Sequence, residues 1–168
     1  MPHSLHTFLL LTGALLLAFA ALHDLGFRTV PNRVSAALLL TGLLLRMAEG
    51  DLITGLLCSA TIFACTIMFW RMGWMGGADV KLLSTTALVV PPAMVLNLVV
   101  GTSLAGGVLA LIYIVGSRLV PRPASSTGLP PNLFWRALRC ERRRLRRRGP
   151  LPYAAAIATG GWLALAAS

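Results

Sequence analysis

The sequence predicts an all-α integral membrane protein, a polytopic bundle of about six transmembrane helices formed by a single domain over residues 1–168. Of the 168 residues, 57% are hydrophobic and 12% are charged, and the mean hydropathy is +0.78. Soluble domains are roughly 45–50% apolar and roughly 25% charged. Several apolar runs approach the roughly 20 residues that span a bilayer. Runs such as Leu38-Leu39-Leu40 lack the alternating pattern of a β-barrel strand.

The net charge of +10 comes mainly from one segment of the chain. Ten of the fifteen Lys and Arg residues are arginines between Arg118 and Arg148. A basic chain can bind nucleic acid, but arginines gathered in one polar segment, 118–152, are typical of a cytoplasmic loop that obeys the positive-inside rule. We therefore expect no nucleic-acid partner. We expect this arginine-rich loop to contact anionic lipid, because its arginines surround an apolar stripe.

The first predicted span covers residues 5–22. Its residues 18–20 (Ala-Phe-Ala) also fit a signal-peptidase site, but no Lys or Arg precedes them, so we expect a retained helix. A polar linker follows, ending in Pro31-Asn32. Proline excludes the helical conformation at the residue before it, and asparagine is a favoured N-cap. A second helix is therefore expected from about Arg33.

The other apolar runs predict spans over residues 34–47, 52–70, 79–90, 93–117 and 153–167. Asp51 is the expected cap of the third span, and Pro91-Pro92 separates the fourth from the fifth. The fourth span has only about 12 residues, or about 18 Å of helix, against a hydrocarbon core of about 30 Å. Either this helix begins earlier or its first residue, Asp79, lies inside the membrane.

The distribution of charge predicts the topology. With six spans and the N-terminus outside, fourteen of the fifteen basic residues fall on the cytoplasmic side. Only Arg46 falls on the other side, together with Glu49 and Asp51. Asp24 and Asp79 then both lie at the cytoplasmic membrane face.

Asp24 and Asp79 are the candidate catalytic residues. A carboxylate at the edge of hydrocarbon is costly, and such residues often mark functional sites. Two carboxylates held close together share a proton, so one can act as a base on water and the other as an acid toward the scissile bond. This aspartic-protease chemistry needs no metal and no other cofactor. Gly76 and Gly77 leave room for a substrate backbone to approach.

Other interpretations of the same residues stay open. An interfacial aspartate is often only a helix cap, and Lys81 can pair with Asp79. A small proton-coupled transporter using Asp24, Asp79 and Lys81 as a relay predicts inverted repeats and charges near the bilayer midplane. The sequence contains no evident repeat. A non-catalytic membrane scaffold that recruits partners through the arginine-rich loop predicts that Asp24→Asn and Asp79→Asn leave function intact.

Three motifs resemble those of the type IV prepilin peptidases. Residues 76–83 (Gly-Gly-Ala-Asp-Val-Lys-Leu-Leu) resemble the family's GxGD-type motif in the form GGxDVKLL. The family's first motif places Arg and Pro-Asn after the first aspartate, and the matching residues here are Asp24, Arg28, Pro31 and Asn32. Residues 151–157 (Leu-Pro-Tyr-Ala-Ala-Ala-Ile) resemble the opening of the family's last helix. The sequence departs from the pattern at Ala78, where the family usually has a second Gly.

The resemblance implies a GxGD-type aspartic peptidase that cleaves the leader of prepilins and pseudopilins at the cytoplasmic face of the bacterial inner membrane. It implies Asp24 and Asp79 as the catalytic pair, no cofactor, and the supporting motif residues Arg28, Pro31, Asn32, Gly76, Gly77, Ala78 and Lys81. The small size, with no methylase domain before the first span, resembles the short CpaA/TadV-like branch that serves tight-adherence (Flp) pili. Pilus-assembly proteins are then alternative partners of the arginine-rich loop.

Overall fold

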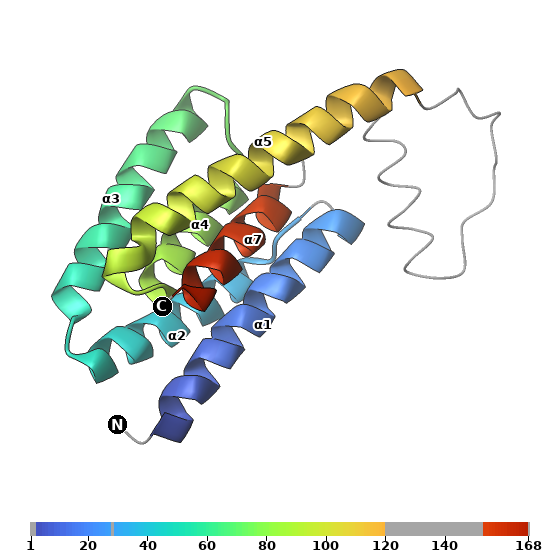
Figure 1. Ribbon diagram of the computed structural model, residues 1–168. Helices are drawn as coiled ribbons and strands as arrows, with labels where there is room; N and C mark the ends of the chain where they lie inside the picture. Colours follow the sequence, from blue (N-terminus) through green and yellow to red (C-terminus); the bar gives the residue numbers. More distant parts are fainter. Residues whose placement is uncertain (1–2, 28, 120–152, 168) are drawn as a thin grey trace.

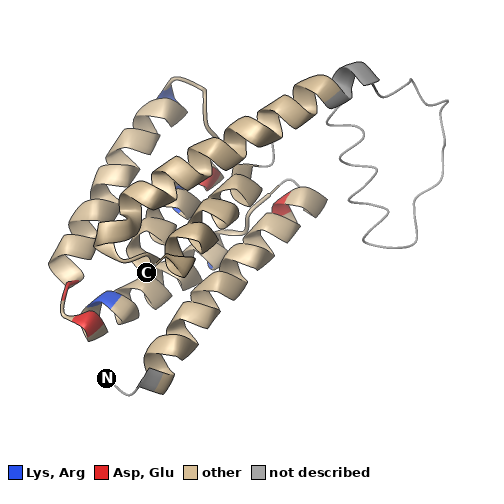
Figure 2. Cartoon of the chain, in the orientation of Figure 1, with Lys and Arg blue, Asp and Glu red and all other residues tan. Residues whose placement is uncertain are grey.

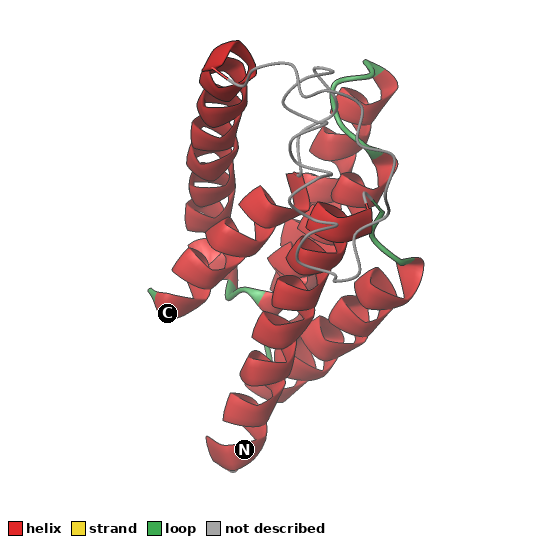
Figure 3. Ribbon diagram, turned by 90° about the vertical axis from the view of Figure 1, so that its right-hand side faces the viewer, coloured by secondary structure: helices red, strands yellow, loops and turns green. Residues whose placement is uncertain are grey.

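The computed structural model describes residues 3–27, 29–119 and 153–167, and over these residues the chain is helical with no strand. The elements are α1 (His3–Phe27), α2 (Asn32–Glu49), α3 (Leu52–Arg71), α4 (Gly77–Val89), the 3-10 turn η1 (Pro92–Met94), α5 (Val95–Leu119) and α7 (Tyr153–Ala166). Figure 3 shows helices joined by short loops throughout this part of the chain. The predicted all-α membrane bundle is confirmed.

The helices form two layers of three (Figure 1). One layer contains α1, α7 and α5, with α7 in the middle, and the other contains α2, α4 and α3, with α4 in the middle. Successive helices run in opposite directions. The end of α1, the starts of α2, α4 and α7, and the end of α5 therefore share one end of the bundle, which we call the aspartate end.

The long helices flank the short ones. Within the part of the chain that the structure describes, three segments are long and apolar enough to cross a membrane: Ser4–Phe27, Leu52–Arg71 and Pro92–Val115. The two central helices, α4 and α7, have only 13 and 14 residues. Large apolar side chains on the long helices point outward, among them Leu15, Ile53 and Leu96. In a membrane these side chains contact lipid, so their exposure does not destabilise the protein.

The central helix α4 is buried on almost every side, with nine of its 13 residues inside the protein. Ser84, Thr85 and Thr86 lie within this buried stretch, and each hydroxyl donates a hydrogen bond to a backbone carbonyl one turn earlier. These bonds satisfy the buried hydroxyls locally. The helix can therefore contact neighbours all round without leaving a polar group unpaired.

Small residues bring α5 and α7 together. A Cβ atom on Gly160 would lie 2.5 Å from the backbone nitrogen of Thr102, and one on Gly101 would lie 3.1 Å from the Gly160 Cα atom. Only glycine permits this separation, as is common where membrane helices pack closely. On its other side, α7 is tied to α1 by the Trp162 indole N–H, which donates to the Ala14 carbonyl at 3.1 Å.

The end of α1 and the start of α4 differ from the prediction. Helix α1 continues to Phe27, so Asp24 lies in its last turn and not in a polar linker. Helix α4 begins at Gly77, earlier than predicted, because the N–H groups of Asp79 and Val80 both bond to the Gly76 carbonyl. At 13 residues it is about 20 Å long, still shorter than the hydrocarbon core.

Of the two predicted caps, Asn32 does not occupy the N-cap position, whereas Asp51 does but forms no capping hydrogen bond. Asn32 is the first helical residue of α2, Pro31 occupies the N-cap position, and the Asn32 side chain accepts a hydrogen bond from Lys81 Nζ at 3.3 Å. Asp51 does occupy the N-cap position of α3 but forms no capping bond. Its carboxylate pairs with Arg46, 2.8 Å away, because that guanidinium is fully buried and needs counter-ions.

Candidate active site

The Asp79 carboxylate lies where a side chain at position 76 would otherwise be, because residue 76 is glycine. Asp79 is half-buried in the first turn of α4. A Cβ atom built on Gly76 would lie 2.9 Å from Asp79 Oδ2. The next glycine acts differently, because a Cβ atom on Gly77 would meet the Trp70 indole nitrogen at 3.3 Å. The first glycine therefore makes room for the carboxylate and the second for a neighbouring aromatic ring.

Asp24 approaches Asp79 from another helix. It lies in the last turn of α1 and is 9% exposed. The two carboxylates are close enough to interact electrostatically. Figure 2 shows acidic positions in red at the last turn of α1 and the first turn of α4, at the same end of the bundle. The antiparallel course of α1 and α2, followed by α3 and α4, returns the chain to this end and brings the two aspartates together.

A cavity of about 660 Å³ opens beside Asp79, between α3, α4, α5 and α7. Its lining is mostly apolar and aromatic, with a few hydroxyl and thiol groups, and comprises Ile62, Cys65, Thr66, Phe69, Trp74, Met75, Gly76, Asp79, Leu83, Val99, Thr102, Ser103 and Tyr153. The rings of Phe69 and Trp74 stack at its wall with centroids 5.9 Å apart. A mostly apolar cavity with a few polar groups is typical of a ligand site.

Tyr153 is a site residue that the sequence analysis did not single out. It is the first residue of α7, its ring packs against Gly106, and it lines the cavity. It also interacts electrostatically with Asp79. Its place in the motif of residues 151–157 was the available signal. Phe69 and Cys65 gave no comparable signal, because only the packing of α3 against α4 brings them to the cavity beside Asp79.

The remaining motif residues occupy the surroundings of the pair. Lys81 bonds to Asn32 and, within the described part of the chain, forms no ion pair with Asp79. Residues two apart on a helix point to nearly opposite sides, which separates these two charges. Arg28 lies outside the described residues.

Ala78 fits the backbone of the motif. It lies in the first turn of α4, in regular helical structure. The glycines with positive φ in the described chain are Gly50 and Gly73, both outside the motif. Alanine is favoured in a helix, so nothing in this backbone requires glycine at position 78.

Among the residues that the structure describes, no three His, Cys, Asp or Glu side chains gather where they could hold a metal ion. Asp24 and Asp79 are two carboxylates without a third such ligand. The expectation that the reaction needs no metal stays a prediction.

A model of the type IV leader peptidase family matches residues 11–111. The chain belongs to this family. The matched region runs from α1 into α5 and includes both aspartates and both of their motifs. No curated protein and no solved structure gives a significant match. The leader peptidase is thus a membrane-embedded helical peptidase, and family membership implies prepilins in general as its substrates.

Proposed function

We propose that this leader peptidase is an aspartic endopeptidase whose catalytic pair is Asp24 and Asp79. The observation that carries the proposal is that these two carboxylates, from separate helices, interact at one end of the bundle. Asp79 also lines a cavity of about 660 Å³.

The reaction follows from the properties of a carboxylate pair. Like charges at short range disfavour ionisation of both groups, so the pair holds one proton between its members. The ionised member takes a proton from a water molecule, which attacks the scissile carbonyl carbon, and the protonated member protonates the leaving amine. The pair returns to its starting state once a proton passes between its members.

We further assign the aspartate end to the cytoplasmic face of the bacterial inner membrane. Arg33, Arg71 and Lys81 are exposed at or near this end, and the chain leaves α5 and enters α7 there, on either side of the arginine-rich loop. This distribution follows the positive-inside rule. A prepilin whose apolar segment lies in the bilayer would then present its leader junction at the level of the aspartates. The short family branch suggests Flp-type prepilins as the substrate.

The test is leader cleavage, measured by the mass of a Flp-type prepilin co-expressed with the full chain. We expect Asp24→Asn and Asp79→Asn each to lower the cleavage rate by roughly 10²–10⁴-fold, the contribution typical of a general acid or base group. The matched control is Asp51→Asn, an equally conservative change at the opposite end. Arg46 keeps its contact with Glu49 in that variant, so cleavage should persist.

All variants must reach the membrane in equal amounts for the comparison to hold. Cleavage that survives both substitutions would refute the aspartic mechanism. A wild-type chain that cleaves no prepilin but carries protons across vesicles would instead favour the transporter. Both aspartates lie in terminal turns of their helices at the aspartate end, which supports the peptidase over that alternative.

A further inference from the structure

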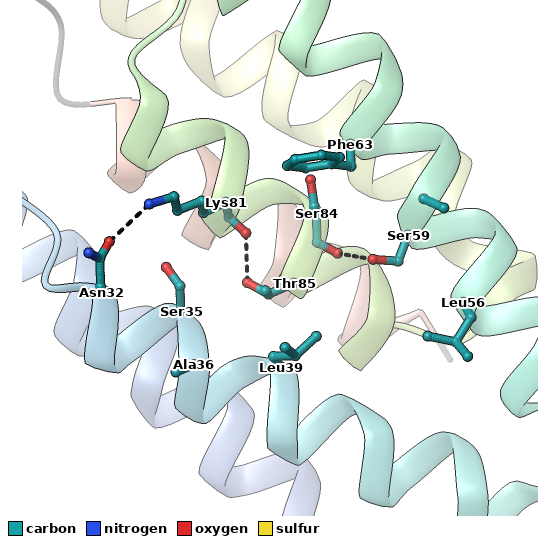
Figure 4. A pocket seen from close by; sticks show the side chains of 11 residues that line it. Asn32, Ser35, Ala36, Leu39, Leu56, Ser59, Phe63, Lys81, Ser84 and Thr85 are labelled. Atoms are coloured by element: carbon teal, nitrogen blue, oxygen red, sulfur yellow. Dashed lines mark hydrogen bonds between the residues drawn. The ribbon is translucent and has the colours of Figure 1, made fainter.

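A second hollow lies on the other side of α4, outside the candidate active site. It is a groove of about 420 Å³ between α2 and α3, with α4 as its floor. Lys81, Ser84 and Thr85 line it from α4, whereas Asp79 and Leu83 face the active-site cavity, and the two linings share no residue. Figure 4 shows the groove with Lys81 and Asn32 at one mouth and Leu39 and Leu56 farther along.

The walls of this groove suit hydrocarbon. Ser59 donates to the Ser84 carbonyl at 2.8 Å, and the Ser84 and Thr85 hydroxyls donate to carbonyls within α4. These lining hydroxyls are therefore already used inside the protein, and a polar ligand would gain little from them. Leu39, Leu56 and Phe63 remain about two-fifths exposed. Their surface can be covered only by another apolar group.

The mouth of the groove suits an anion. Lys81 is exposed, and its ammonium group bonds to the neutral side chain of Asn32. No acidic side chain among the described residues pairs with it. Ser35 lies one turn after Asn32 on α2 and also lines the groove. A cation with amide and hydroxyl groups nearby is a suitable site for a phosphate group.

The volume of the groove is compatible with one lipid chain. A helix about 10 Å wide with 1.5 Å per residue occupies on the order of 120 Å³ per residue, so 420 Å³ would hold about one turn. At about 30 Å³ per methylene, close to the volume of a water molecule, the same space holds on the order of 14 methylenes. Ala36 on α2 and Ala60 on α3 both line the groove, and their small side chains leave it open.

We propose that this groove binds one anionic glycerophospholipid, with its phosphate at Lys81 and Asn32 and one acyl chain between α2 and α3. The site would anchor the lipid against α4, the helix that carries Asp79, and is independent of the proposed catalytic pair. Since Lys81 supplies the charge and the alanines supply the space, the two contributions can be removed separately.

The experiment uses the full chain in phosphatidylcholine vesicles that contain a small fraction of photoreactive lipid, with a diazirine at mid-chain. After irradiation, crosslinked peptides are mapped by mass spectrometry. Photoreactive phosphatidylglycerol should crosslink Leu39, Leu56 and Phe63 several-fold more than photoreactive phosphatidylcholine does. Lys81→Gln should lower phosphatidylglycerol crosslinking roughly fivefold, the factor that corresponds to about 1 kcal/mol per cation at an anionic surface. Arg71→Gln, a cation near the same end outside the groove, should change nothing.

Ala60→Trp tests the space independently of the charge. It should abolish crosslinking of the groove by both lipids. If Lys81→Gln is not monodisperse after purification, Ala60→Trp alone tests the proposal. Crosslinking of the groove no stronger than that of Leu15, an outward residue of α1, would overturn the proposal, because it would indicate bulk lipid only. Equal losses in Lys81→Gln and Arg71→Gln, or exclusion of lipid by a co-reconstituted prepilin segment, would also overturn it.

Discussion

The carboxylates at the two ends of the bundle have different charged neighbours. Away from the aspartate end, Arg46 lies 2.7 Å from Glu49 and 2.8 Å from Asp51, and His6 Nε2 lies 2.8 Å from Glu49. The Arg46 side chain is fully buried, its stem lies against Gly55, and its Nη2 donates to the Val89 carbonyl at 3.4 Å. We call these four residues, His6, Arg46, Glu49 and Asp51, the Arg46 cluster. It joins α1, α2, α3 and α4.

At the aspartate end, two carboxylates interact electrostatically and the nearby lysine bonds to a neutral side chain. Lys81 bonds to Asn32 on the groove side of α4, while Asp79 faces the cavity and Asp24. Charged side chains therefore have two roles in this molecule. In the Arg46 cluster opposite charges fix helices in place, whereas Asp24 and Asp79 repel each other, an arrangement that costs stability and suits proton transfer.

Substitution of Arg46 should lower the free energy of unfolding of the protein the most. Arg46→Met leaves two carboxylates without their cation, and breaking a buried pair typically costs 3–5 kcal/mol. Glu49 and Asp51 remain about 30% exposed and keep some water, so we expect the lower limit, about 3 kcal/mol. Denaturant unfolding in detergent measures the loss.

The matched control is Arg71→Met, which removes an exposed arginine at the end of α3 and should change stability by less than about 0.5 kcal/mol. Leader cleavage per folded molecule should stay near the wild-type rate in both variants. Equal stability of the two variants would mean that the Arg46 cluster does not hold the helices together.

A methyl group at position 76 should perturb the aspartate end without loosening the bundle. The Gly76 backbone is extended, with φ −72° and ψ 144°, so alanine fits its conformation. The added Cβ atom would lie 2.9 Å from Asp79 Oδ2 and must displace the carboxylate. We expect Gly76→Ala to lower cleavage at least about tenfold, because small misplacements of reacting groups are costly, with little change in the unfolding midpoint.

Gly77→Ala provides the comparison within the same motif. Its new Cβ atom would contact Trp70 at 3.3 Å and not the carboxylate, so cleavage should fall much less than in Gly76→Ala. Equal losses from the two variants would show that the motif needs glycine for a reason other than room for Asp79.

The smallest effect is expected at position 78, where this chain departs from its family. Ala78→Gly introduces glycine into the first turn of α4 and should cost up to about 1 kcal/mol of stability. Cleavage should stay within about twofold of wild type, because no positive φ is needed there. A clear rise in cleavage rate would show that alanine at this position restricts the active site.

The sequence predicted the helices better than their contacts. Apolar runs and prolines placed all six described helices within a few residues, and alternation of direction put Asp24 and Asp79 at one end. The contact of Lys81 with Asn32 and the joining of His6 to Glu49 link residues on different helices, and no local pattern encodes such pairs. The cavity was missed for the same reason, because Phe69 and Tyr153 line one cavity only after α3 and α7 have both packed against α4.

The short central helices change how this protein meets its bilayer. A 13-residue helix facing lipid would be about 10 Å too short and would force the membrane to thin or the helix to move. Here α4 is enclosed between longer helices, and α7 lies between the long helices α1 and α5. Most of the mismatch therefore falls inside the protein, where the cavity opens beside Asp79. A peptide bond near the membrane surface can then be reached without deforming the surrounding bilayer.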